Sequence, residues 1–232
     1  MKSPPASRSE LDAVVVNIEL TLVSVVQGLA LTFLAENAGQ VVSQGPWTAW
    51  AYVVVSFFII LLFWARAAIH TLTLIRWPLE FVHNFFYFGC GLMEVLAFMH
   101  LRDPFAWFVC NAVFAALVWA LFMHDLRIIR MRKEDSAGPV GGRLYAIVEA
   151  DQWLNIRVIV PVFFLFNVAA AVAIRRAPDF FVVRQGHLIL VGCQIVGFAL
   201  YLVYVVRAFS KMTPLISATR AEWQDDVEQM PE

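Results

Sequence analysis

Ionisable side chains inside long apolar stretches are the residues of this sequence that could do chemistry. Glu94 lies within the apolar run from Phe81 to Met99, where an unpaired carboxylate is costly to bury. Such a group can accept a proton, bind a cation or pair with an arginine such as Arg66. It can equally be a paired or protonated group that locks two helices together. At about 100° per residue, Glu94 shares one helix face with four other residues, Glu80, His83, Tyr87 and Gly91.

Small polar residues form a second pattern, in the first apolar run. Within about a third of the helix circumference the sequence places Asn17, Thr21, Ser24, Gly28, Leu31 and Thr32, with Gln27 at the edge of that face. Hydroxyl and amide groups in such a row can line a water-filled pathway, with Leu31 or Leu20 as a hydrophobic constriction. The same row contains a Ser24-x-x-x-Gly28 pair, which also lets two helices approach closely. Pore lining and helix packing both remain open.

Glu19 falls on the apolar side of the same run, away from the polar row. It lies at a depth similar to that of Arg66 in the second apolar run. An ion pair between Glu19 and Arg66 would lower the cost of placing both charges in a membrane. We therefore expect these two side chains to pair.

Motifs of enzymes, metal sites and cofactor sites are missing from the sequence. The five histidines have no HxxH, HxxxH or HExxH spacing, and the three cysteines lie singly inside apolar runs. There is no phosphate-binding glycine loop and no nucleophile elbow. The net charge of −1 gives no basis for binding nucleic acid. We predict no catalytic set, no metal and no cofactor.

Six apolar runs must position these residues. The chain has 232 residues, of which 61% are hydrophobic and 15% charged, whereas a soluble domain carries about a quarter charged residues. A bilayer core needs about 20 apolar residues in a helix. Such runs lie at Ala13–Leu34, Ala49–Leu74, Phe81–Met99, Phe105–Ile128, Val158–Ala173 and His187–Val206. The sequence therefore predicts an all-α integral membrane protein with a six-transmembrane-helix bundle and the lipid bilayer as its environment.

The connections predict the domain organisation and the orientation. Residues 1–12 form a polar leader without the features of a signal peptide, 13–209 the six-helix domain, and 210–232 a polar tail with a short surface helix. The loop 130–151 has a glycine-rich centre typical of a flexible linker. Thirteen of the 17 Lys and Arg residues fall on the side of the termini and four on the other. The positive-inside rule then places both termini in the cytoplasm. We expect the membrane to be a bacterial plasma membrane.

The layout resembles the transmembrane protein 175 family, whose members are potassium-permeable channels. The second run reads Ser56-Phe-Phe-Ile-Ile-Leu-Leu-Phe-Trp64 and is followed by His70. The third contains Asn84-Phe-Phe-Tyr-Phe, the fourth carries Asn111, and the fifth begins Leu154-Asn-Ile-Arg-Val-Ile-Val-Pro161. The family's Phe-Ser-Asp signature is not retained, because the matching stretch is Val25-Val26-Gln27-Gly28, with Gln27 in the place of the aspartate.

The resemblance implies a passive leak channel for monovalent cations such as potassium, in which first helices line the pore of a homo-oligomer, a tetramer in that family. Two other functions remain open. One is a non-conducting sensor, scaffold or effector subunit, which the missing signature favours. The other is a membrane enzyme or small-molecule transporter that uses Glu94, Asn84 and His83 inside the bundle.

Overall fold

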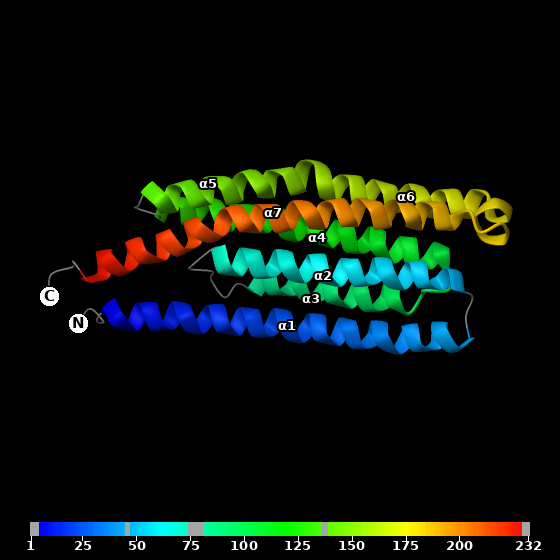
Figure 1. Ribbon diagram of the computed structural model, residues 1–232, viewed down its shortest axis with the longest axis horizontal. Coiled ribbons are helices and arrows are strands. Elements are labelled where there is room, and N and C mark those ends of the chain that lie inside the picture. The colour runs from blue at the N-terminus through cyan, green and yellow to red at the C-terminus, as the bar shows by residue number, and fades with distance from the viewer. Residues whose placement is uncertain (1–4, 45–46, 74–80, 136–138, 229–232) are drawn as a thin grey trace.

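The described chain is entirely helical in its regular structure and forms a long bundle (Figure 1). The computed structural model describes residues 5–44, 47–73, 81–135 and 139–228. In this part of the chain, six helices are long and apolar enough to cross a membrane. They are Val14–Val41, Trp47–Thr71, Phe81–Phe98, Pro104–Met131, Val140–Arg176 and His187–Thr219. The predicted all-α class is confirmed, and the six predicted spans correspond to six helices that are long and apolar enough to cross a membrane.

Continuous apolar runs become helices because a lipid environment leaves no water for backbone N–H and C=O groups, which must then bond within the segment. The breaks occur where the sequence provides turn residues. Between the third and fourth spans, the Asp103 carboxylate accepts a hydrogen bond from the backbone N–H of Ala106 at 3.1 Å. Pro104 begins the next helix, a position where its missing N–H is tolerated.

The elements are α1 (Pro5–Gln44), η1 (Trp47–Ala49), α2 (Trp50–Thr73), α3 (Phe81–Phe98), α4 (Pro104–Asp135), α5 (Pro139–Leu154), η2 (Asn155–Ile159), α6 (Val160–Arg176), η3 (Asp179–Val183) and α7 (His187–Glu228). Neighbouring spans run antiparallel, so that the start of α1 and the end of α7 lie at the same end of the bundle, here called the terminal end (Figure 1). Helix α1 lies at one edge and packs on α2 and α3, while α4 packs on α3, α5 and α6, and α7 packs on α2 and α5.

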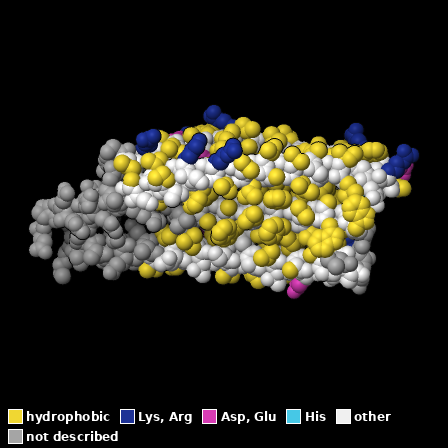
Figure 2. Space-filling view, in the orientation of Figure 1, with side chains coloured by type: hydrophobic (Ala, Val, Ile, Leu, Met, Phe, Trp, Pro, Cys, Tyr) yellow, Lys and Arg dark blue, Asp and Glu magenta, His cyan; other side chains and the backbone are white. Residues whose placement is uncertain are grey.

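The outer surface is apolar along the middle of the bundle, as a membrane protein requires. In Figure 2 a stretch of hydrophobic side chains separates two groups of Lys and Arg. Large apolar side chains such as Leu165, Ile189 and Leu200 are more than half exposed on this surface. The structure therefore supports a multi-pass integral membrane protein.

Helices extend further than the sequence predicted. The loop expected at 130–151 is wrong for most of its length, because α4 continues to Asp135 and α5 begins at Pro139. Leu144, Tyr145 and Val148 share one face of α5 and are buried in an apolar cluster with α4 and α7. This packing offsets the low helix propensity of the glycines before them.

Two other boundaries differ in the same way. Helix α1 extends to Gln44, and α7 continues through Pro214 to Glu228, where a separate tail helix was predicted. The predicted break at Trp77-Pro78 lies outside the described residues.

A wide helical turn joins α5 to α6. Residues Asn155–Ile159 form the π-helical segment η2, and the backbone N–H of Val160 bonds to the carbonyl of Asn155. Pro161 follows directly, and a proline removes a backbone donor and crowds the carbonyl four residues earlier. Widening the turn accommodates both effects, and it keeps α5 and α6 in one continuous span.

Gly91 sets the distance between α1 and α3. A Cβ atom added there would lie 2.6 Å from Cγ1 of Val26, whereas one added at Gly89 would lie at an ordinary 3.6 Å from Leu117. We expect Gly91→Ala to lower the free energy of unfolding by about 1–3 kcal/mol, because valine is stiff and overpacking strains both helices. Thermal unfolding in detergent micelles, followed by circular dichroism, measures the change.

Gly89→Ala is the matched control on the same helix. It gains helix propensity without a clash, so its stability should be equal to or higher than that of the parent protein. Equal stability of the two variants would contradict close packing of α1 on α3.

Candidate functional site

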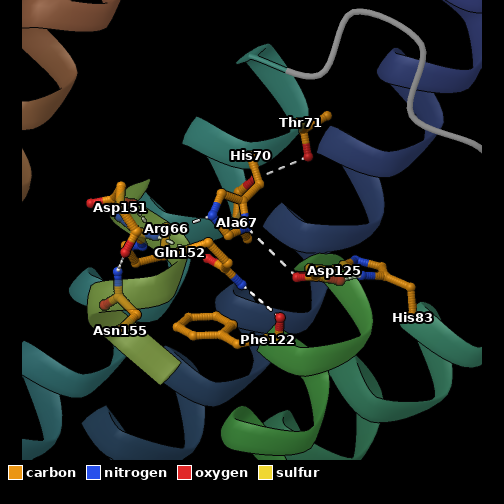
Figure 3. Close-up of polar contacts among 10 residues, drawn as sticks. All are labelled: Arg66, Ala67, His70, Thr71, His83, Phe122, Asp125, Asp151, Gln152 and Asn155. Atoms are coloured by element: carbon orange, nitrogen blue, oxygen red, sulfur yellow. Dashed lines mark hydrogen bonds and ion pairs between the residues drawn. The ribbon is translucent and has the colours of Figure 1, made fainter. Parts of the chain in front are cut away.

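Charged and amide side chains meet inside the bundle in its terminal half (Figure 3). They come from α2, α3, α4, α5, η2 and α7, and most are almost completely buried. We call this set the charged cluster, and its members are Arg66, His70, His83, Asp125, Asp151, Gln152, Asn155, Tyr201 and Tyr204.

Arg66 is the centre of the cluster. Its Nη2 atom lies 2.6 Å from Oδ2 of Asp151, and the guanidinium carbon lies 5.8 Å from the centre of the Phe122 ring. The same Nη2 lies 3.1 Å from Nε2 of His70 and 3.4 Å from Oε1 of Gln152. Because an arginine stays charged in proteins, Asp151 neutralises a charge that would otherwise be strongly destabilising at this depth.

The contact with Arg66 determines the protonation of His70. A guanidinium can only donate hydrogen bonds, so Nε2 of His70 must accept and His70 is neutral, with its proton on Nδ1. That Nδ1 lies 3.6 Å from Oδ2 of Asp125, and Nδ1 of His83 lies 2.8 Å from the other carboxylate oxygen. A connected row of ionisable groups therefore runs from α2 through α4 to α3 (Figure 3).

The other side of the cluster connects to α7. The Tyr204 hydroxyl donates to Oδ1 of Asp151 at 2.6 Å, and the Tyr201 hydroxyl donates to Oδ1 of Asn155. Intramembrane rows of Asp, His and Tyr of this kind are found in proton relays as well as in structural networks. Among the described residues no three His, Cys, Asp or Glu side chains are placed to hold a metal ion.

Glu94 pairs with Gln27 of α1, and not with Arg66. Nε2 of Gln27 donates to Oε2 of Glu94 at 2.9 Å. In the described part of the chain, the other side-chain oxygens, Oε1 of Gln27 and Oε1 of Glu94, are buried without a hydrogen-bond partner. A buried carboxylate oxygen without a partner is suited to accept a proton or to bind a cation.

The expected ion pair between Glu19 and Arg66 is wrong. Glu19 accepts a hydrogen bond from Nδ2 of Asn84 at 3.1 Å, while Arg66 bonds to Asp151 across the bundle. The two charges lie at similar depths, but they point into different interhelical contacts. Two side chains at the same depth in the membrane pair only if the helix faces that carry them are in contact, and depth alone does not determine that.

The polar row of α1 lies on the outer face of this edge helix. Thr21 and Thr32 donate to backbone carbonyls one turn earlier in α1, those of Asn17 and Gly28. Gln27 lies on the inner face with Glu94. The exposed residues are Asn17, Thr21, Ser24, Gly28, Leu31 and Thr32.

Six members of the charged cluster were not singled out as site residues from the sequence, including Asp125 in the fourth apolar run. Asp151, Gln152 and Asn155 lay in or next to the predicted loop, so they did not count as intramembrane residues. Their spacing, with Tyr201 and Tyr204 three residues apart on α7, places each group on one helix face. Treating 139–160 as part of a span would have revealed the pattern.

Replacing only one residue of the Arg66–Asp151 ion pair should destabilise the protein far more than replacing both with apolar residues. We expect Asp151→Leu to lower the free energy of unfolding by about 3–5 kcal/mol, because Arg66 is left charged and buried. Adding Arg66→Met should restore most of that loss, since two apolar side chains replace the pair. Unfolding of both variants in detergent micelles measures the effect.

Glu149 on the same helix provides the control. It forms ion pairs with Arg130 and Lys133 at 2.9 and 3.0 Å, and both basic side chains are largely exposed. Glu149→Gln should change stability by no more than about 1 kcal/mol. A large loss in the double variant, equal to that of Asp151→Leu, would contradict the pairing described here.

No family model, curated protein or solved structure matches this chain.

Proposed function

We propose that this protein is a homo-oligomeric membrane channel for monovalent cations, potassium-like in preference, with its pathway lined by the outer face of α1. The observation that carries the proposal is the placement of six residues, Asn17, Thr21, Ser24, Gly28, Leu31 and Thr32, all exposed in a row on the edge helix. In a single copy these polar groups would face lipid. Around a central axis they would face water.

The geometry of α1 supports assembly through this face. A Cβ atom placed on Gly28 meets no atom within 4 Å, so a neighbouring helix can approach closely there. The inner face of the helix is held to α3 by side-chain hydrogen bonds from Gln27 to Glu94, from Asn84 to Glu19, and from the Tyr87 hydroxyl to a backbone carbonyl of α1. The helix is therefore anchored on one side and unoccupied on the other.

Permeation through such a pathway would be passive. Hydroxyl and amide oxygens would replace part of the hydration shell of the ion, and a ring of Leu31 or Leu20 would be the narrow point. The excess of basic residues on the side of the termini supports a cytoplasmic location for both ends, in a bacterial plasma membrane. A tetramer is the assembly implied by the resemblance to the transmembrane protein 175 family.

Tryptophan substitutions on the outer face test the proposal. Reconstituted protein should pass potassium across liposome membranes, and Ser24→Trp or Gly28→Trp should reduce the flux by at least about tenfold, because each copy adds a large ring to the pathway. A potassium-sensitive dye inside the liposomes measures the rate.

Leu29→Trp is the matched control, since Leu29 is 57% exposed but lies about 100° around the helix from the centre of the row. Its flux should equal that of the parent protein. Absence of potassium flux in the parent protein, or flux unchanged by both row variants, would refute a pathway along α1. Oligomers that can be cross-linked through α1 but pass no potassium would show that the outer face of α1 only packs against neighbouring copies.

A second candidate function, a proton-coupled or cation-coupled transporter, is favoured by the pair of Gln27 and Glu94. The two buried oxygens without partners are acceptors for a bound proton or cation. In that case Glu94→Gln should abolish acidification-dependent flux of the transported ion, while the Gln27 contact is kept by an amide of the same shape. Glu36→Gln, in the exposed part of α1, should leave that flux unchanged. Normal flux in Glu94→Gln would eliminate this candidate.

A further inference from the structure

A cavity of about 310 Å³ lies between α2, α4, α6 and α7, away from the polar row of α1. Phenylalanine rings form much of its wall, including Phe63, Phe114, Phe163 and Phe198. Val162 and Gly197 also line it and are exposed on the outer surface of the bundle. The cavity therefore opens sideways, toward the lipid.

Among the polar side chains that line this apolar cavity, two have atoms without a hydrogen-bond partner. They are Arg66, 2% exposed, and Gln194, 5% exposed. Within the described chain, Nε and Nη1 of Arg66 and Oε1 of Gln194 are unpaired, although Nη2 of Arg66 bonds to Asp151 and Nε2 of Gln194 bonds to Asn167. Buried donors left unpaired are costly, so a ligand that supplies an acceptor to Arg66 would bind favourably.

Charge determines what kind of acceptor fits. Arg66 carries one positive charge, while Asp125 and Asp151 carry two negative charges, and His70 is neutral because it accepts from Arg66. A proton on His83 would bring the total only to zero. Because the cluster offers no net positive charge, an anionic head group would add an unbalanced charge in a medium of low dielectric constant.

We propose that this cavity is a binding site for an uncharged, lipid-soluble carbonyl compound. Its carbonyl oxygen accepts a hydrogen bond from Nε or Nη1 of Arg66, and its apolar body lies among the phenylalanine rings. A quinone head group and the ester of an acylglycerol both have this chemistry. The rings favour the quinone, because flat conjugated rings stack on aromatic side chains or contact them edge to face.

Gly197→Phe tests the site by filling it. A Cβ at Gly197 meets no atom within 4 Å, so the new ring can occupy the cavity without a clash inside the protein. Binding of a short-chain benzoquinone and of a monoacylglycerol is measured on the full chain in lipid nanodiscs. We expect saturable binding of at least one probe, weakened at least about tenfold by Gly197→Phe.

Gly192→Phe is the matched control, because Gly192 is on the same helix, also meets no atom within 4 Å, and does not line the cavity. It should bind the probe like the parent protein. Arg66→Lys, which lacks the guanidinium Nε and Nη1 donors, should weaken binding about tenfold if it stays folded by circular dichroism.

The two probes separate the sources of the carbonyl group. Quinone binding alone identifies a quinone site and monoacylglycerol binding alone an ester site, and either supports the proposal. No saturable binding of either probe, binding unchanged by Gly197→Phe, or tighter binding of a fatty-acid anion than of both neutral probes would overturn it. The assay measures no ion flux, so its result is independent of whether the protein conducts.

Discussion

A guanidinium inside a membrane bundle must have its charge neutralised, and much of this structure is arranged around that requirement. Arg66 of α2 reaches Asp151 of α5 at 2.6 Å, and Asp151 also accepts from Tyr204 of α7. The contact of Arg66 with His70 then directs the His70 proton toward Asp125 of α4. One buried charge thus connects four helices.

The number of spans could be predicted from the sequence because it depends on local properties, namely length and hydropathy. The pairing of side chains could not, because it depends on which faces of distant helices meet. Glu94 and Arg66 were recognised as unusual, yet their partners Gln27 and Asp151 became visible only in three dimensions. The helix over 139–151 was missed for a similar reason. Glycine lowers its local propensity, and the packing of Leu144 and Val148 that favours it is a tertiary contact.

The two faces of α1 have different roles. The inner face attaches the helix to α3 through Gln27, through the carboxylate of Glu19, and through the close approach of Val26 to Gly91. The outer face carries small side chains that satisfy part of their hydrogen bonding within the helix itself, as Thr21 and Thr32 do. A helix fixed on one side can present the other side to a neighbour without losing its own position. The lateral cavity lies on the opposite part of the bundle, so an assembly through α1 would leave its mouth open to lipid.

The wide turn at Asn155–Ile159 changes which direction the side chains of the second half of the fifth span face. A π-helical turn contains one residue more than an α-helical turn, which rotates everything after it by about 100°. Asp151 and Gln152 before the turn face the charged cluster, and Phe163 and Phe166 after it line the lateral cavity. Without the extra residue, Phe163 and Phe166 would be rotated by about 100° from the positions that line the cavity. The span therefore consists of two half-helices, one on each side of the wide turn before Pro161. Their relative rotation about the helix axis is set by a single extra residue.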